Sequence, residues 1–263
     1  MELRQDLHIH THRSNCGKPC NTVRAIIETA ERQNLLLAGI TDHIDLPEQA
    51  ERFREIYKAN RADAAKFPSQ CRILIGAEAS MISPETCALP DDLARKLDFV
   101  IVSCNHYHLL TVSKPPHPDP ISYAEHHLAM IRGAAALGFA VVIAHPFLND
   151  YCDPKLAAQT LKKYKEKDLA HTLDCLAKAH VALEVNPYRV VNALGWFKDL
   201  VKEARRRGVR FSLGSDAHTL ERIGFPPVPI EAAKGTIKPA DVCERIGLTL
   251  DDLVWPFISS GTD

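Results

Sequence analysis

The sequence predicts an α/β protein in which seven strands form one closed or nearly closed barrel, and two observations carry that prediction. Short apolar runs alternate with stretches that have the periodicity of amphipathic helices. Such alternation favours parallel strands joined by right-handed helical crossovers. The runs recur seven times with no low-complexity linker between them, so we expect residues 1–263 to form a single domain. An open, doubly wound sheet is the alternative arrangement.

The predicted strands are apolar at successive positions, as in the segments VVIA and RILIGA, which is typical of strands covered on both faces. In chain order they are Leu3–His10, Leu35–Asp42, Arg72–Ala79, Phe99–Cys104, Phe139–His145, Val181–Asn186 and Arg210–Asp216. No glycine-rich phosphate loop follows the first strand, and this disfavours a nucleotide-binding open sheet.

Amphipathic segments between the strands predict the helices. Asn21 is expected to cap the first helix, because its side chain can accept a hydrogen bond from a free backbone N–H. The apolar stripe of that helix consists of Val23, Ile26, Ile27 and Ala30. A second helix is expected over Ile121–Leu137, after an extended loop at Lys114–Pro120, where prolines block a helix.

Three consecutive arginines follow the apolar stripe of a third predicted helix. The stripe consists of Leu194, Phe197, Val201 and Ala204. Arg205–Arg207 suit the last turn of a helix, where cations oppose the helix dipole, and Gly208 is expected to end it. A nucleic-acid-binding patch is the alternative interpretation of these arginines.

Composition and charge limit the classes of function. Hydrophobic residues make up 46% and charged residues 25% of the chain, which allows a sizeable core. The formal net charge of −1 indicates no general attraction to nucleic acid or to an acidic membrane surface. The chain shows no apolar signal segment, no run long enough to span a membrane and no repeated CxxC pairs among its eight cysteines. We therefore expect a cytoplasmic protein with reduced thiols.

Potential metal ligands lie at the carboxyl end of almost every predicted strand or directly after it. They are His8, His10, Asp42, His43, Glu78, His106, His108, His145, Glu184, Asp216 and His218. The carboxyl ends of parallel barrel strands converge on one face, so these side chains are expected to meet there. Strand ends are exposed to water in any barrel, but that alternative does not explain a set rich in His, Asp and Glu. The pattern therefore predicts a metal site.

The segments DLHIHTH, GITDH, GAEAS, IAHP and GSDAH, in this order, resemble the motifs of the PHP (polymerase and histidinol phosphatase) superfamily. The resemblance extends from Asp6 to His218. It implies a distorted (β/α)7 TIM-like barrel and a phosphoesterase activity. It also implies a cluster of two to three divalent metal ions, which are zinc, manganese or iron.

The resemblance further implies how the metal ligands are grouped. One ion is expected at His8, His10, Glu78 and Asp216. Glu78 is expected to bridge to a second ion, which also takes His145 and a histidine after the fourth strand. The third ion is expected at His43 and His218, with a ligand from the loop after the first strand.

Two positions depart from the family pattern. Where the family loop supplies a histidine, this chain has Cys16, with His12 nearby. Cys16 either binds the third ion, making that site softer and more oxidisable, or leaves it weak or empty. In the segment SCNHYH, Asn105 occupies the family's histidine position. A one-residue shift would present His106, which we expect to be the ligand, and His108 is the alternative.

Together with the metal site, the resemblance implies a hydrolase that acts on a small-molecule phosphate monoester. Metal ions lower the pKa of bound water from about 15.7 to about 7, and we expect a metal-bridging hydroxide to attack phosphorus. The residues expected to carry the reaction are Glu78, Asp216, His218 and His108. The leaving oxygen is expected to be protonated by a metal-bound water or by one of these two histidines. The cations expected to bind substrate are Arg189, Arg13 and Lys18. Histidinol phosphate, nucleotides and sugar phosphates are the candidate substrates.

Two other functions fit parts of the pattern. A metal-dependent amidohydrolase also begins with HxH, but it usually needs an eighth strand and often a lysine after the fourth, which Phe99–Cys104 lacks. An inactive regulatory module would have lost several ligands, whereas nearly all positions are filled. A nuclease is disfavoured by the absence of a basic excess.

Overall fold

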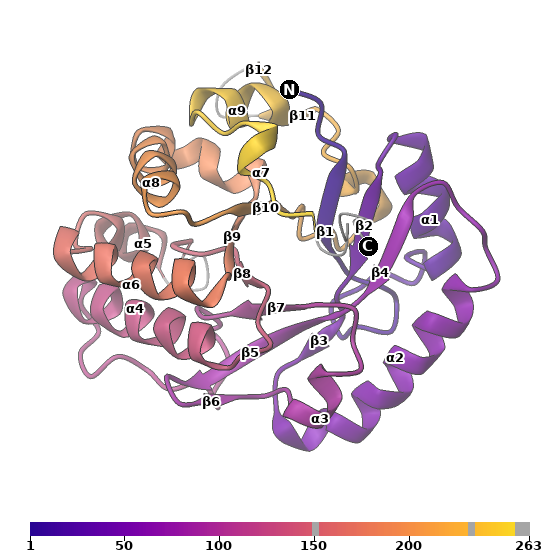
Figure 1. The fold of residues 1–263 in the computed structure, drawn as a ribbon, viewed down its shortest axis with the longest axis horizontal. Helices are drawn as coiled ribbons and strands as arrows, with labels where there is room; N and C mark the ends of the chain where they lie inside the picture. Colours follow the sequence, from indigo (N-terminus) through magenta and orange to yellow (C-terminus); the bar gives the residue numbers. More distant parts are fainter. Residues whose placement is uncertain (149–152, 231–234, 256–263) are drawn as a thin grey trace, which may run out of the picture.

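The strands of the computed structural model, which describes residues 1–148, 153–230 and 235–255, form the seven staves of a barrel (Figure 1). Five staves are single strands: β1 (Gln5–Ile9), β7 (Val100–Ser103), β8 (Val142–Ala144), β9 (Ala182–Val185) and β10 (Phe211–Leu213). Two staves are interrupted: β2 (Leu37–Ile40) continues as β3 (His43–Ile44), and β4 (Arg72–Ile75) continues as β5 (Ala77–Ser83).

Neighbouring staves pair in parallel all the way round the barrel. The order is β1-β2-β4 in one sheet and β3-β5-β7-β8-β9-β10 in the other. The N–H of Gly76 donates to the carbonyl of Ile40 at 2.8 Å, which links the two sheets across the interruptions. The last stave returns to the first, because the N–H of Ala217 donates to the carbonyl of His8 at 3.1 Å. The predicted seven-stranded, distorted (β/α)7 barrel is therefore confirmed.

The prediction of two unbroken strands at Leu35–Asp42 and Arg72–Ala79 is wrong in detail. The first is interrupted where the buried carboxylate of Asp42 accepts a hydrogen bond from the N–H of Thr11 at 2.7 Å. The second is interrupted at Gly76, where a Cβ atom would lie 2.5 Å from the carbonyl oxygen of Phe99. The first break thus coincides with a contact to the loop after β1 and the second with a close approach to Phe99, and a run of apolar residues reveals neither.

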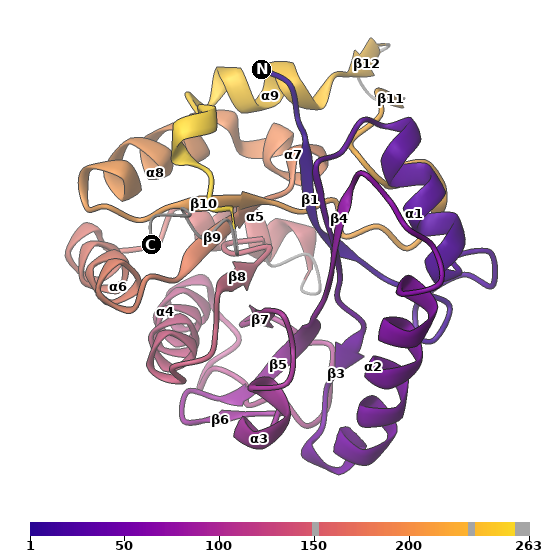
Figure 2. The same cartoon turned by 45° about the vertical axis from the view of Figure 1, so that its right-hand side comes forward.

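Helices cover the outside of the barrel (Figures 1 and 2). The long ones are α1 (Val23–Arg32), α2 (Ala50–Ala64), α4 (Pro120–Ala136), α6 (Glu166–Ala179) and α8 (Leu194–Arg206). The shorter ones are α3 (Asp91–Ala94), α5 (Pro154–Leu161), α7 (Pro187–Val190) and α9 (Pro239–Arg245). Two antiparallel pairings were not predicted, between β5 and β6 (Thr86–Cys87) and between β11 (Val228–Ile230) and β12 (Gly235–Ile237).

The predicted cap of α1 is wrong by one residue. The Thr22 hydroxyl, not the Asn21 amide, accepts the hydrogen bond from the N–H of Ala25, at 3.2 Å. Asn21 instead donates to the carbonyl of His10 at 3.1 Å, so its side chain ties the start of α1 to the end of the first stave. The predicted apolar stripe of α1 is buried, and on α4 Leu128, Ile131 and Ala135 are buried.

The three arginines lie in the last turn of α8 and at its C-cap. Arg205 pairs with Asp252, Arg206 with Glu203, and Arg207 with Glu203 and Asp174. Gly208 follows with a φ of 81°, the left-handed conformation that ends helices. Because each guanidinium already has a carboxylate partner, the helix-end interpretation is the one that holds.

The interior of the barrel below the carboxyl ends of the staves is apolar. Buried side chains from several staves meet there: Leu7, Leu37, Leu74, Ile101, Val142 and Ala182. This apolar layer fills the barrel interior, and the polar residues at the strand ends lie directly above it. Within the described ranges no helix is both long and apolar enough to cross a membrane, and the seven cysteines found there are free thiols.

Candidate metal centre

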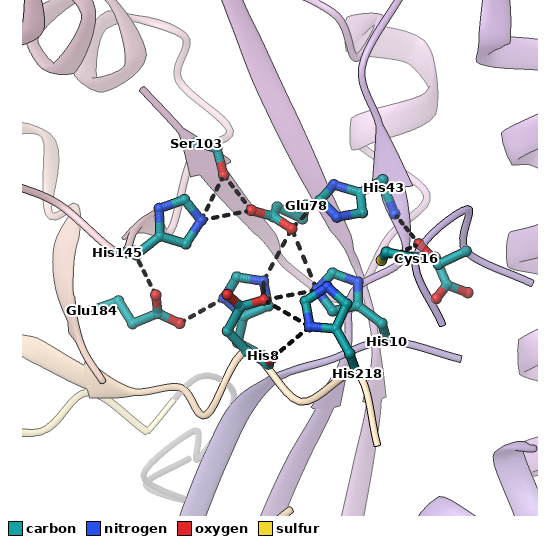
Figure 3. Close-up of polar contacts among 12 residues, drawn as sticks. His8, His10, Cys16, His43, Glu78, Ser103, His145, Glu184 and His218 are labelled. Carbon is teal, nitrogen blue, oxygen red and sulfur yellow. Dashed lines mark hydrogen bonds and ion pairs between the residues drawn. The ribbon is translucent and has the colours of Figure 1, made fainter. Parts of the chain in front are cut away.

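Most of the residues predicted to bind metal converge at the carboxyl ends of the staves (Figure 3). His8 lies on β1, Glu78 lies on β5 and His145 follows β8. Their exposed fractions are 0%, 1% and 1%. Burying carboxylates and imidazoles in this way is costly unless each is paired or coordinates a metal.

Two groups of donor atoms share Glu78. The first consists of His8, His10, Glu78 and Asp216, whose ligand atoms all lie within 4.8 Å of one another. In it, Nε2 of His8 lies 3.0 Å from Oε2 of Glu78 and 3.5 Å from Oδ1 of Asp216. The second group consists of Glu78, His106 and His145. The other Glu78 oxygen, Oε1, lies 3.3 Å from Nε2 of His106 and 3.0 Å from Nε2 of His145. The two oxygens of one carboxylate therefore face two different groups.

A third group lies on the outer side of the first. It consists of His10, Cys16, His43 and His218, and their ligand atoms meet the same 4.8 Å limit. The rings of His43 and His218 both pack against His10, with centroids 4.6 Å away in each case. Cys16 is thus the residue of its loop that reaches the cluster. His12 is exposed, and its Nδ1 lies 3.3 Å from the carbonyl of Asn21 instead.

The fourth stave presents His106 to the cluster. Ser80 and His106 are linked by a 2.7 Å hydrogen bond between Oγ and Nδ1, so the other ring nitrogen faces Glu78. Asn105 turns away and donates to the carbonyls of His145 and Leu148 at 3.1 and 2.6 Å. His108 is exposed, and its ring packs edge-on against His106. The structure therefore brings His106, and not His108, into the donor groups.

Two residues of the cluster have unusual backbone conformations. His145 has a φ of 31° and Asp216 a φ of 55°, a region that non-glycine residues rarely adopt. Such conformations cost of order 1–3 kcal/mol and persist where the surroundings impose them. Here Glu184 accepts a hydrogen bond from the N–H of His145, and Asn105 binds its carbonyl. The strain therefore lies at residues whose side chains point into the cluster.

Glu184 orients the imidazole ring of His8 by bonding to the ring nitrogen that faces away from Glu78, a role that sequence analysis did not assign. Its Oε1 lies 2.8 Å from Nδ1 of His8, so it holds that nitrogen protonated and leaves Nε2 to face Glu78. Gly214 makes room for it, because a Cβ there would lie 1.7 Å from the same oxygen. The signal was present, since Glu184 lies near the carboxyl end of the sixth stave, but only the fold shows that its carboxylate points at His8.

Asp45 is a second residue that sequence analysis missed. Its Oδ1 lies 3.7 Å from Nδ1 of both His43 and His106, and the three form a further donor group. It also accepts a hydrogen bond from Ser80 at 2.6 Å. Asp45 lies beyond the predicted strand, in a loop, and for this reason the strand-end criterion did not find it.

Several buried donor atoms of the cluster do not hydrogen-bond to one another, and their arrangement suits bound metal ions. Nε2 of His8, Nδ1 of His43 and Oε2 of Glu78 are buried, and within the described residues none of the three forms a hydrogen bond of acceptable geometry. Native proteins leave few buried polar atoms unsatisfied. Nitrogen and carboxylate atoms converging on a common point without bonding each other are the arrangement that a divalent cation satisfies.

The electrostatics of the cluster lead to the same interpretation. Burial lowers the pKa of His8, but Glu184, Glu78 and Asp216 together raise it well above its ordinary value. Burial raises the pKa of the Cys16 thiol, but hydrogen bonds from the surrounding histidines lower it to about 3. These directions favour a Cys16 thiolate and a protonated His8, whereas burial lowers the pKa of His145. Metal binding releases such protons and takes over their charge.

The three cations predicted to bind substrate differ in their surroundings. Arg189 lies beside the cluster, with Nη2 2.8 Å from Oδ2 of Asp216. Arg13 is held by Asp63 at 2.6 Å and by Asn60 at 3.0 Å. Lys18 is exposed on the loop after β1. Of the three, Arg189 forms an ion pair with a residue of the donor groups.

Comparison with known proteins adds independent findings. The family model of the PHP domain matches residues 6–206. A "Probable histidinol-phosphatase" from Deinococcus radiodurans is 27% identical over 252 residues, covering 84% of this chain and 88% of the relative. A "Probable phosphatase" from Aliivibrio fischeri is 27% identical over 220 residues, covering 81% and 78%. A histidinol phosphate phosphatase from Lactococcus lactis, solved with zinc, L-histidinol and phosphate, has the same fold, with a TM-score of 0.61, 18% identity and 95% of each chain covered.

Proposed function

The chain belongs to the PHP domain family, and from this membership we propose that it is a metal-dependent phosphoesterase that hydrolyses a small-molecule phosphate monoester. The observation that carries the proposal is the convergence of three donor groups around Glu78 and His10. Hydrolytic metal sites in barrel proteins are typically built from histidine and carboxylate ligands at the carboxyl ends of the strands.

We assign two ions to the groups that share Glu78 and a third to the group of His10, Cys16, His43 and His218. Imidazole and carboxylate donors suit zinc, manganese and iron alike. Cysteine in the third group favours zinc there, because thiolate is a soft ligand that zinc binds well. A cluster of two to three divalent ions is therefore the proposed cofactor.

Bound divalent ions supply Lewis acidity, which makes a nucleophile available near neutral pH and neutralises charge on the phosphoryl oxygens. The protein's own contribution is orientation. Glu78 presents one oxygen to each buried group, and Glu184 fixes the ring of His8. Arg189, at the edge of the cluster, has a planar guanidinium that suits two phosphate oxygens at once.

His108 is the residue that we assign to protonate the leaving oxygen. It is exposed, it lies next to the cluster, and it belongs to none of the donor groups. His218 is better suited to be a ligand, because its Nδ1 already faces the carbonyl of Asp216 at 2.8 Å and its ring reaches Cys16. A general acid of this kind typically contributes about 10²–10⁴-fold to the rate.

Elemental analysis of the purified protein, together with a phosphate-release screen, tests the proposal. The screen begins with p-nitrophenyl phosphate and histidinol phosphate and continues with nucleotides and sugar phosphates. We expect two to three metal equivalents per chain and release from at least one substrate. A protein that binds no metal after reconstitution with zinc or manganese, or one that carries metal but releases phosphate from none of these esters, would contradict it.

A further inference from the structure

A cavity of about 350 Å³ lies beside the metal centre. Its lining includes Asp216 and His218, which belong to the donor groups, and also Tyr188, Arg189 and Arg222. Tyr188 and Arg189 belong to α7, and Arg222 ends the 3-10 turn Leu220–Arg222 that follows the last stave. Two loops at the carboxyl ends of neighbouring staves, β9 and β10, thus build this cavity together.

Arg222 is held over a fixed aromatic ring. Its guanidinium carbon lies 4.9 Å from the centroid of the Tyr188 ring, within the range of a cation–π contact. The hydroxyl of Tyr188 donates to the carbonyl of Pro226 at 2.7 Å, which prevents the ring from turning. An exposed arginine that would otherwise sample many rotamers is therefore preorganised at the cavity.

Among the residues that the structure describes, no carboxylate pairs with the guanidinium of Arg222. Arg189, by contrast, lies 2.8 Å from Asp216. Glu221, its neighbour in the sequence, bonds to Thr219 instead. The carboxylate of Asp216, which also lines the cavity, is assigned to the metal under the proposed function. Within the described residues, the cavity lining therefore includes one guanidinium, that of Arg222, without a carboxylate partner.

We propose that this cavity binds a second anionic group of the substrate, a carboxylate or a second phosphate, and that Arg222 contacts it directly. The inference rests on the proposed function and narrows it, because it concerns the part of the substrate that is not cleaved. Substrates with an ammonium group at that position are disfavoured by repulsion from Arg222. Sugar bisphosphates, nucleoside bisphosphates and phosphorylated acids are favoured over phosphates of amino alcohols.

Three phosphonates that cannot be hydrolysed test the inference on the manganese-loaded protein. Propylphosphonate has one anionic group, 3-phosphonopropionate adds a carboxylate, and propane-1,3-bisphosphonate adds a second phosphonate. Isothermal titration measures their Kd values for the wild-type protein, Arg222→Ala, Arg222→Lys and the control Arg206→Ala. Arg206 is a suitable control because it is also an exposed arginine but pairs with Glu203 on α8.

We expect at least one of the two doubly anionic ligands to bind the wild-type protein at least tenfold more tightly than propylphosphonate. In Arg222→Ala the Kd of propylphosphonate and that of the doubly anionic ligand should become about equal. The ratio of these two Kd values should be intermediate in Arg222→Lys and unchanged in Arg206→Ala. The tighter of the two ligands shows whether the second anion is a carboxylate or a phosphate.

Equal binding of all three ligands by the wild-type protein, or a preference that survives in Arg222→Ala, would overturn the inference. In either case, release of phosphate from p-nitrophenyl phosphate would leave the proposed function standing. If no phosphonate binds and no ester is hydrolysed, both proposals fail together.

Discussion

The inner and outer halves of the cluster are built differently. The inner half, represented by His8, Glu78 and His145, is almost completely buried, and its side chains come from staves or from the residues that directly follow them. In the outer half, the side chains of His43 and His218 are 14% and 36% exposed, and Cys16 comes from a loop. Burial and rigid strands favour tight, slowly exchanging metal ions, whereas loops and water contact favour weaker ones.

The halves also differ in how their donors are oriented. Inner donors are fixed from behind by other side chains, as Glu184 fixes His8 and Ser80 fixes His106. Ser103 likewise donates to Glu78. In the outer half, His218 is oriented by a backbone carbonyl, that of Asp216. Because such partners typically change metal affinity by about 10–100-fold, the two halves should respond differently to mutation.

The largest effect is expected for Glu78→Gln, which removes the carboxylate shared by both inner groups. We expect activity to fall by at least about 10³-fold, since a lost bridging ligand removes several kcal/mol of Lewis-acid stabilisation. At least one metal equivalent should be lost. Phosphate-release kinetics and elemental analysis measure the two effects. Full metal content with a wild-type rate would show that Glu78 is not the bridge.

His108→Ala tests whether an exposed residue outside the donor groups takes part in the reaction. We expect the rate with alkyl phosphates to fall by about 10²-fold, because their alkoxide leaving groups need a proton. The rate with p-nitrophenyl phosphate should change much less, since p-nitrophenolate leaves without one. Metal content should remain that of the wild-type protein. An equal loss with both leaving groups would exclude His108 as the acid.

Glu184→Gln sharpens the comparison, because it alters the inner half without removing a ligand. The amide keeps the size of the side chain but weakens its hold on Nδ1–H of His8. We expect the affinity for the inner ions to fall by about 10–100-fold while the outer ion is retained. Chelator competition followed by elemental analysis measures this difference. Uniform loss of all ions would indicate that the two halves are not independent.

The smallest effect is expected for Cys16→Ser, which alters only the outer half. A hydroxyl is a far poorer zinc ligand than a thiolate, so we expect the third equivalent to be lost and the inner two to remain. Activity should fall only severalfold, because the carboxylate shared by the inner groups is untouched. If the metal stoichiometry is unchanged in this variant, Cys16 does not bind an ion.

Much of the cluster could be predicted because residues at the carboxyl ends of parallel barrel strands all lie on the same face of the barrel. A ligand such as His145 or Asp216 at the end of an apolar run must lie on the carboxyl face, whatever the details of packing. Asp45 and Asn21 show where this rule stops. Asp45 lies in a loop after its strand, and Asn21 was expected to cap α1 but bonds to the carbonyl of His10.

The sequence by itself determined the number of staves, their order and the face on which the ligands gather, because hydrophobic periodicity and chain direction are local properties. Only the tertiary structure decided which donors meet. His106 rather than Asn105 faces Glu78 because Ser80, on another stave, bonds to its ring. Glu184 lies behind His8 because Gly214 leaves room for it. Both outcomes depend on contacts between residues far apart in the chain, which a pattern read along it does not contain.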